Sequence, residues 1–148
     1  MTIAHDSIKA FLEQFQTNSN SKDATAQVSH FSEVFLAAGP GGAAPVTVED
    51  FAKVLPKRRQ ILEQAGLQGA NLGSFETTAT SERHAVVNVV WNMCFTTQAE
   101  AHITIPVSAT FVLDMAGEKP HLLVYLAHQD IMKVLKDKGM LRSVRDAN

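Results

Sequence analysis

The sequence predicts an α+β protein, in which amphipathic helices precede a meander of long β-strands. Two segments, residues 84–97 and 102–114, carry an apolar residue at every second position, from 85 to 95 and from 103 to 113, as strands with one buried face do. A third strand is expected at residues 122–128. The helices are indicated by apolar residues at helical spacing between residues 8 and 62.

One face of each of the two longest strands is wholly apolar. Successive side chains point to opposite sides of a strand, so each strand places this face on a hydrophobic core. The apolar positions are Ala85, Val87, Val89, Trp91, Met93 and Phe95 in the first strand, and Ile103, Ile105, Val107, Ala109, Phe111, Leu113 and Met115 in the second.

The opposite face of these strands carries almost no formal charge. A sheet face in contact with solvent usually carries charged side chains, whereas the cores of protein interfaces are depleted of charge. We therefore expect a sheet-to-sheet homodimer; the alternative is that loops of the same chain cover this face. The residues expected in the contact are Asn88, Val90, Asn92, Thr104, Ser108, Thr110 and Tyr125.

Composition indicates an ordinary globular protein. The chain has 148 residues, 45% of them hydrophobic, and a formal net charge of −2. We expect one domain over residues 1–148, with its core at about 5–139 and a polar, disordered tail at 140–148. The charge gives no reason to expect nucleic-acid binding, and no apolar run reaches the ~18 residues of a membrane span.

The single cysteine, Cys94, limits the covalent links and metal sites that the chain can form. One cysteine cannot form an intrachain disulfide or a cysteine zinc cluster. We expect a cytoplasmic protein that holds neither a metal nor a cofactor.

Three helices are expected before the long strands. The second begins after Asp23, whose carboxylate can accept hydrogen bonds from the free amides of the first turn. The third is capped by Thr47 and ends at Gly66. Pro56 removes one helical hydrogen bond and is expected to kink this helix or split it near Val54. The first helix carries an apolar stripe made of Ile8, Phe11, Leu12 and Phe15.

The remaining elements are a short strand, a long strand and a final helix. The short strand is expected at residues 33–38, before a glycine-rich loop at 39–42. The first long strand is expected at 70–80. A final helix at 129–138 follows the last strand, and Asp130 favours its N-terminus.

This layout resembles the nuclear transport factor 2-like superfamily, whose members include SnoaL-like polyketide cyclases, ketosteroid isomerase and scytalone dehydratase. The resemblance covers residues 8–138. It implies a strongly curved, mostly antiparallel sheet wrapped around the N-terminal helices as a cone-shaped barrel with an apolar pocket. It also implies a C-terminal helix and dimerisation through the outer sheet face. The segments that carry it are residues 23–36, 39–42, 108–114 and 121–130.

The catalytic residues of the ketosteroid isomerases are not matched. Their general base is an Asp directly before a Pro, in the region after the second helix, whereas Gly39 precedes Pro40 here. Where those enzymes place an oxyanion-stabilising Tyr, the first helix offers only Phe11 and Phe15. A phenyl ring cannot donate a hydrogen bond, so the steroid-isomerase mechanism is not expected.

Two histidines are candidate proton-transfer groups. His128 shares the alternation of Leu126 and is expected on the cavity side, where Asp130 could orient it as a general base. The alternative is that His128 caps the sheet edge and bonds to backbone. His30, near the end of the second helix, could face the same pocket, or lie at the surface or in a cap.

Three functions are therefore considered. The first is a homodimer that binds a small apolar molecule. The second is a SnoaL-like cyclase, isomerase or dehydratase that uses His128 with Asp130, or His30. The third is an interaction module whose cone is filled by its own side chains, which an empty cavity on the order of several hundred Å³ would exclude. The expected pocket residues are Phe11, Phe15, Phe31, Trp91, Val107, Phe111 and Leu126.

Overall fold

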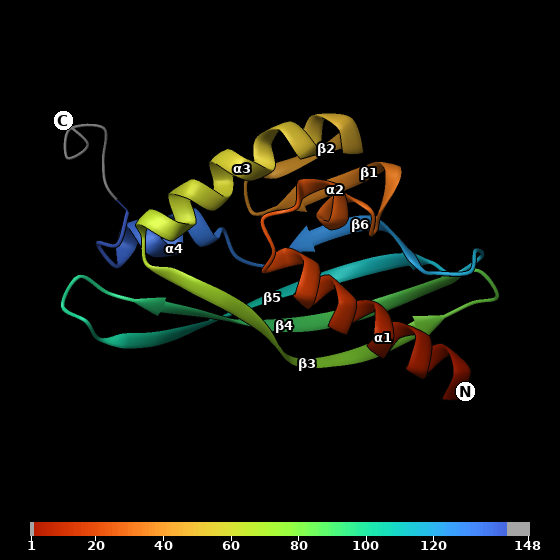
Figure 1. Ribbon diagram of the computed structural model, residues 1–148. Helices are drawn as coiled ribbons and strands as arrows, with labels where there is room; N and C mark the ends of the chain where they lie inside the picture. The colour runs from red at the N-terminus through yellow and green to blue at the C-terminus, as the bar shows by residue number, and fades with distance from the viewer. Residues whose placement is uncertain (1, 142–148) are drawn as a thin grey trace.

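The computed structural model describes residues 2–141 and has the predicted α+β fold (Figure 1). Within these residues two helices precede the strands, a third lies between the second and third strands, and a short fourth helix follows the last strand. The elements are α1 Thr2–Ser19, α2 Ala24–Val28, β1 Phe31–Gly39, β2 Gly42–Thr47, α3 Val48–Gln64, β3 Leu67–Thr80, β4 His84–Thr96, β5 His102–Asp114, β6 His121–Ala127 and α4 Ile131–Asp137.

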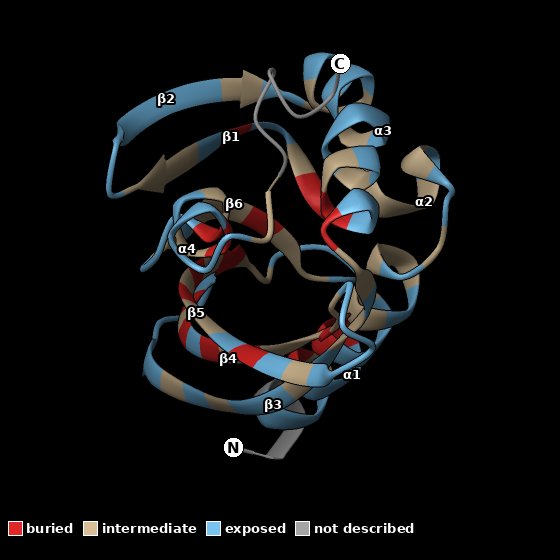
Figure 2. Cartoon of the chain, turned by 90° about the vertical axis from the view of Figure 1, so that its left-hand side faces the viewer, coloured by how far each residue is buried: buried red, intermediate tan, exposed pale blue. Residues whose placement is uncertain are grey.

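The strands of residues 2–141 form one six-stranded sheet in the order β2-β1-β6-β5-β4-β3. Only the pairing of β1 with β6 is parallel, so the sheet is mostly antiparallel, as predicted. The sheet is strongly curved, and α1, α2 and α3 lie along its concave side (Figures 1 and 2). Its edges, β2 and β3, do not pair with each other, so the cone stays open and does not close into a barrel.

The curvature of the sheet is explained by irregular pairing along β3. This strand has an extra, unpaired residue at Gln68, at Gly73 and at Thr78 relative to β4. Each such bulge bends its strand and increases the local twist. The bulges therefore help β3 to follow α1 along the side of the cone.

The hydrophobic core lies on the concave face of the sheet (Figure 2). The predicted alternation is confirmed, because Val87, Val89 and Phe111 are fully or almost fully buried. They pack against the apolar stripe of α1. A second cluster joins the end of α3 and α4 to the far ends of β4 and β5; its buried members are Leu62, Ala65, Phe95, Ile105, Ile131 and Leu135.

The helix ends form largely as predicted. Asp23 caps α2, because its Oδ1 accepts hydrogen bonds from the amides of Thr25 and Ala26. The Thr47 hydroxyl caps α3 by accepting from an amide of its first turn. Pro56 lies inside α3, which nevertheless runs as one helix and is not split.

Two features of the N-terminal half were not predicted. The glycine-rich loop at 39–42 belongs to a hairpin, because Gly39 pairs with Gly42 and Pro40 and Gly41 form its tight turn. The second arm, β2, was not expected because it is short and contains Pro45. Proline cannot donate to a strand ladder and is tolerated at a sheet edge, which is where β2 lies.

The first two residues of the expected tail lie within the described part of the chain. Met140 donates a backbone hydrogen bond to the carbonyl of Leu135 at 2.8 Å, and Met140 and Leu141 pack against the second core cluster. Residues 142–148, the rest of the expected tail, lie outside the described residues.

Candidate functional site

A cavity of about 790 Å³ lies between the concave face of the sheet and the helices. Side chains of α1 and α3 form one side, the central strands form the other, and the β1–β2 turn and the start of α4 border it. This cavity favours an open cone over one filled by its own side chains. Six aromatic residues contribute to the wall: Phe15, Phe31, Phe35, Phe51, Trp91 and Tyr125.

Phe15 is the centre of this aromatic wall. Its ring stacks on Trp91 with centroids 5.5 Å apart and planes 26° apart, and it lies 5.5 Å from Phe111 and 5.9 Å from Phe31. Phe111 is fully buried behind the wall and supports Tyr125 at 4.9 Å. Such offset and tilted contacts are favourable, so the rings hold one another in place without a ligand.

Arg59 of α3 fixes the mouth of the cavity. Its guanidinium donates to the carbonyl oxygens of Ser19, Asn20 and Ser21 at 3.0, 3.0 and 2.7 Å. Its Nε donates to the Glu63 carboxylate at 3.0 Å. The planar, always charged guanidinium suits this arrangement, which ties the loop after α1 to α3.

Arg59→Ala is expected to lower the free energy of unfolding by about 2–3 kcal/mol, because it removes charged hydrogen bonds to partly buried carbonyls. Urea denaturation followed by circular dichroism measures this loss. The control is Arg58→Ala, since Arg58 is exposed and is expected to change stability by no more than about 0.5 kcal/mol. Equal losses in both variants would contradict the structural role of Arg59.

The same loop is also attached to the edge strand β3. Asn20 Oδ1 accepts from the amide of Ala70 at 2.9 Å, and Asn20 Nδ2 donates to the carbonyl of Ala70 at 2.9 Å. Gln16 Oε1 accepts from the amide of Leu72 at 2.7 Å. These bonds satisfy backbone groups of an edge strand and hold the mouth on its second side.

The structure of β6 places Tyr125 and Leu126 on the opposite sides of the sheet from those predicted. Leu113 pairs with Leu122 and Val112 with Val124, so Leu123 is an extra, unpaired residue in β6. This bulge reverses the alternation of every residue after it. Consequently, Tyr125, which was expected at the dimer contact, faces the cavity.

Leu126 differs from its prediction in the opposite sense. It was expected in the pocket, but it pairs with Thr110 on the outer face and is 39% exposed. The sequence gives no sign of this exchange, because residues 122–127 are apolar in both phases of the alternation.

His128 also lies on the outer face of the sheet and not on the cavity side. Its Nε2 lies 2.8 Å from Thr110 Oγ1, and its Nδ1 lies 2.8 Å from Ser108 Oγ. Thr110 in turn donates to Asn88 Oδ1 at 2.7 Å. Asp130 does not orient this ring: its Oδ1 accepts from two amides at the start of α4, as the cap of that helix. His128 and Asp130 therefore do not form the expected pair of a general base and its orienting carboxylate.

His30 is buried beside the aromatic wall. Asn18 Nδ2 lies 2.7 Å from His30 Nε2, and an amide nitrogen can only donate, so this ring nitrogen accepts. Burial lowers the pKa of His30, and the positive charges of Lys119 and His121 lower it further. A neutral, accepting ring packed against Phe11 at 5.3 Å fits a structural role.

The remaining predicted pocket residues divide into wall and support. Phe15, Phe31, Trp91 and Val107 line the cavity. Phe11 and Phe111 lie in the core behind them. Sequence reasoning missed Phe35 as a lining residue, although it lies within the short strand expected at 33–38. It also missed Phe51 and Leu55, two lining residues of α3.

The outer face carries the other residues expected at a dimer contact. By the pairing of β4 with β5, Asn88, Val90, Asn92, Thr104, Ser108 and Thr110 lie on this face. Ser108 also borders the cavity where the sheet meets α4. The neighbouring row across four strands is wholly apolar: Leu36, Val124, Val112 and Val86.

Two further properties of the described residues bear on function. Residues 2–141 contain no group of three or more His, Cys, Asp or Glu side chains placed to hold a metal ion. Among the described helices, none combines the length and apolar character that crossing a membrane requires.

Comparison with known proteins defines the fold. The chain matches no protein-family model and no curated protein. Solved structures match with high similarity of shape and low identity of sequence, and they include proteins described as NTF2-like and cystatin-like. The chain therefore has the nuclear transport factor 2-like, cystatin-like fold, as the sequence resemblance implied.

Three solved structures illustrate the likeness. Aln2 from a Streptomyces species matches with a TM-score of 0.71 and 9% identity over 90% of this chain and 96% of that chain. A protein of unknown function from Mycobacterium tuberculosis matches with 0.71 and 10% over 86% and 72%. An NTF2-like protein from Novosphingobium aromaticivorans matches with 0.69 and 12% over 88% and 87%. At these identities the likeness describes the fold alone.

Proposed function

We propose that this protein is a homodimer that binds a small, largely apolar, ring-containing molecule in its cavity. The observation that carries the proposal is the cavity of about 790 Å³ with six aromatic side chains in its wall. Its volume lies within the range of about 300–1,000 Å³ that is usual for small-molecule sites. Aromatic walls favour ligands with rings, because ring faces and edges pack well against one another.

The position of Trp91 provides a direct test of binding. It is the single tryptophan of the chain and lines the cavity, so its fluorescence reports on what enters there. Titration with N-phenyl-1-naphthylamine, a neutral ring compound, is expected to quench Trp91 emission and to enhance emission of the probe. An unchanged Trp91 spectrum up to the solubility limit of the probe would contradict the proposal.

Ala127→Phe is expected to weaken binding of this probe by about tenfold or more, because the added ring occupies space in the cavity. Ala127 lines the cavity beside the β1–β2 turn. The matched control is Ala79→Phe, which makes the same change at an exposed position of β3. A similar loss of affinity in both variants would show that the probe binds elsewhere.

The dimer is proposed through the outer sheet face. Leu36 is 38% exposed and Leu126 39% exposed on this face, next to an apolar row and an uncharged polar network. Large exposed apolar side chains on a face poor in charge favour association. Light scattering is expected to give twice the 16.1 kDa mass of the chain.

Cys94 is a free thiol, in keeping with the reducing cytoplasm as the proposed location.

The proton-transfer alternative has less support from the geometry. His128 lies on the outer face with both ring nitrogens close to hydroxyl groups, and Asp130 caps α4. His30 is buried, and its lowered pKa leaves it neutral. A general base must reach the proton that it removes. Neither histidine lines the cavity, and Asp130, which does, accepts hydrogen bonds from two amides of α4.

A further inference from the structure

Two neighbouring arginines of α3 line the cavity, but other described residues hold the guanidinium of only one of them. Arg59 is held by four hydrogen bonds to the loop after α1 and to Glu63. Arg58 makes no ion pair and no side-chain hydrogen bond with any other residue in the range 2–141. Arg58 is exposed and lines the cavity, so its guanidinium lies at the mouth with its donors available.

The Tyr125 hydroxyl is a second donor without a partner. Tyr125 lines the same cavity, and within the described part of the chain its hydroxyl makes no hydrogen bond. Burial raises the pKa of this phenol, and the positive charge of Arg58 opposes the rise. The hydroxyl is therefore protonated at neutral pH and can donate. Tyr125 is half-buried and lines the cavity, so a ligand there can accept a hydrogen bond from its hydroxyl.

We propose that Arg58 and Tyr125 together bind an anionic oxygen of the ligand, so that the cavity takes an organic anion with a ring-containing apolar body. This inference rests on the proposed function and names its ligand class: an aromatic or alicyclic carboxylate or phenolate. Both groups are donors, and hydrogen bonds to an ionised oxygen are about twice as strong as neutral ones. The rings would enter the aromatic wall while the charge stays near the mouth.

The other charges around the cavity agree with this orientation. Asp130 also lines the cavity, next to α4, and its negative charge disfavours an anion at that end. Arg59 adds a second positive charge on the α3 side, although its donors are occupied. The electrostatic field of these charges therefore favours a position near α3 for the anionic group of a ligand.

A pair of fluorescent probes tests the inference. 1-Anilinonaphthalene-8-sulfonate has the same rings as N-phenyl-1-naphthylamine and one additional sulfonate. Both are titrated into the intact protein, with quenching of Trp91 as the signal that the cavity is occupied. Ala127→Phe is expected to weaken both probes, which confirms that they share the cavity.

Arg58→Gln is expected to weaken binding of the sulfonate probe by about tenfold or more and to leave the neutral probe within about twofold. Tyr125→Phe, which removes only the hydroxyl, is expected to weaken the sulfonate probe by about fivefold. Since this hydroxyl has no partner in the described structure, the thermal midpoint should stay the same and show that the variant is folded.

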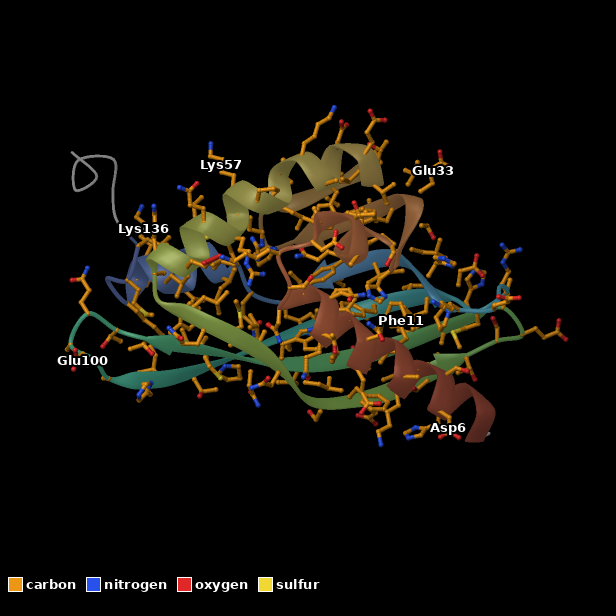
Figure 3. The ribbon with its side chains drawn as sticks, in the orientation of Figure 1. Asp6, Phe11, Glu33, Lys57, Glu100 and Lys136 are labelled. Atoms are coloured by element: carbon orange, nitrogen blue, oxygen red, sulfur yellow. The ribbon has the colours of Figure 1, made fainter. Side chains whose placement is uncertain are left out.

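Lys57→Gln is the matched control for charge. Lys57 is adjacent in sequence and exposed, and its side chain points away from the sheet (Figure 3). Removing it changes the net charge as Arg58→Gln does, but it should leave both affinities within about twofold. Equal weakening by the two variants would overturn the inference, because it would show a general effect of charge.

The failure of this inference can be told apart from the failure of the proposed function. If both probes bind equally well and Arg58→Gln affects neither, the ligand class is wrong while the cavity still binds ring compounds. If neither probe alters Trp91 emission, both proposals fail. Tighter binding of the sulfonate probe, with loss in Arg58→Gln and Tyr125→Phe but not in Lys57→Gln, is the result that supports the inference.

Discussion

Val90→Glu is expected to convert the proposed dimer into a monomer. Val90 lies on the outer face of β4, between Ser74 of β3 and Ser108 of β5, at the centre of the proposed contact. A carboxylate buried there without a partner costs about 3–5 kcal/mol, which corresponds to a weakening of dimerisation by more than about a hundredfold. Size-exclusion chromatography with light scattering measures the change in mass.

The control for this variant is Val54→Glu, which makes the same substitution at a position of α3 that is 55% exposed. It should leave the mass unchanged. In the separated chain Glu at position 90 would face solvent, so the far-ultraviolet circular dichroism of Val90→Glu should match that of the wild type. A Val90→Glu protein that keeps the mass of the wild-type dimer would refute the outer face as the interface.

Gly66→Ala is expected to lower the free energy of unfolding by at least about 3 kcal/mol, from backbone strain together with a steric clash. Gly66 joins α3 to β3 with φ of 105°, a conformation that residues with a side chain rarely adopt. An added Cβ would also lie 2.0 Å from the carbonyl oxygen of Thr96. Thr96 donates a backbone hydrogen bond to Gly66 at 2.9 Å, so the two strands cannot separate to relieve the clash.

Two other glycines separate the causes of this loss. Gly139 has φ of 73°, but a Cβ added there would have no atom within 4 Å, so Gly139→Ala should cost only about 1 kcal/mol of strain. Gly41 has neither a positive φ nor a close neighbour, so Gly41→Ala should have an effect within about 0.5 kcal/mol. Chemical denaturation of the three variants measures the series. Equal losses for Gly66 and Gly139 would rule out the contact with Thr96 as a cause.

The long central strands could be predicted because their signal is local and repeated. β4 and β5 each alternate over 13 residues, and one wrong position would not hide such a pattern. β2 could not be predicted in the same way, because Gly42–Thr47 is short and contains Pro45. It forms a strand through its pairing with β1, which is a tertiary interaction that its own residues do not indicate.

The candidate site was predictable only in its apolar part. Phe15 and Trp91 could be placed in the cavity wall because each continues an apolar stripe of its own element. The role of Arg59 could not be predicted, because its carbonyl partners lie 38–40 residues away in sequence. Arg58 and Arg59 look alike as a basic run on a helix, and only the fold shows that one is occupied and the other is not.

The unpaired Leu123 decides which residues of the last strand face the cavity. Deleting this one residue would restore the simple alternation and leave the later pairs unchanged, with Tyr125 opposite Phe111 and Leu126 opposite Thr110. If Leu123 instead took a place in the ladder, every later residue would change sides: Tyr125 would turn outwards, and Leu126 and His128 would turn towards the cavity. The location of one unpaired residue therefore sets the ligand wall and the outer face at once.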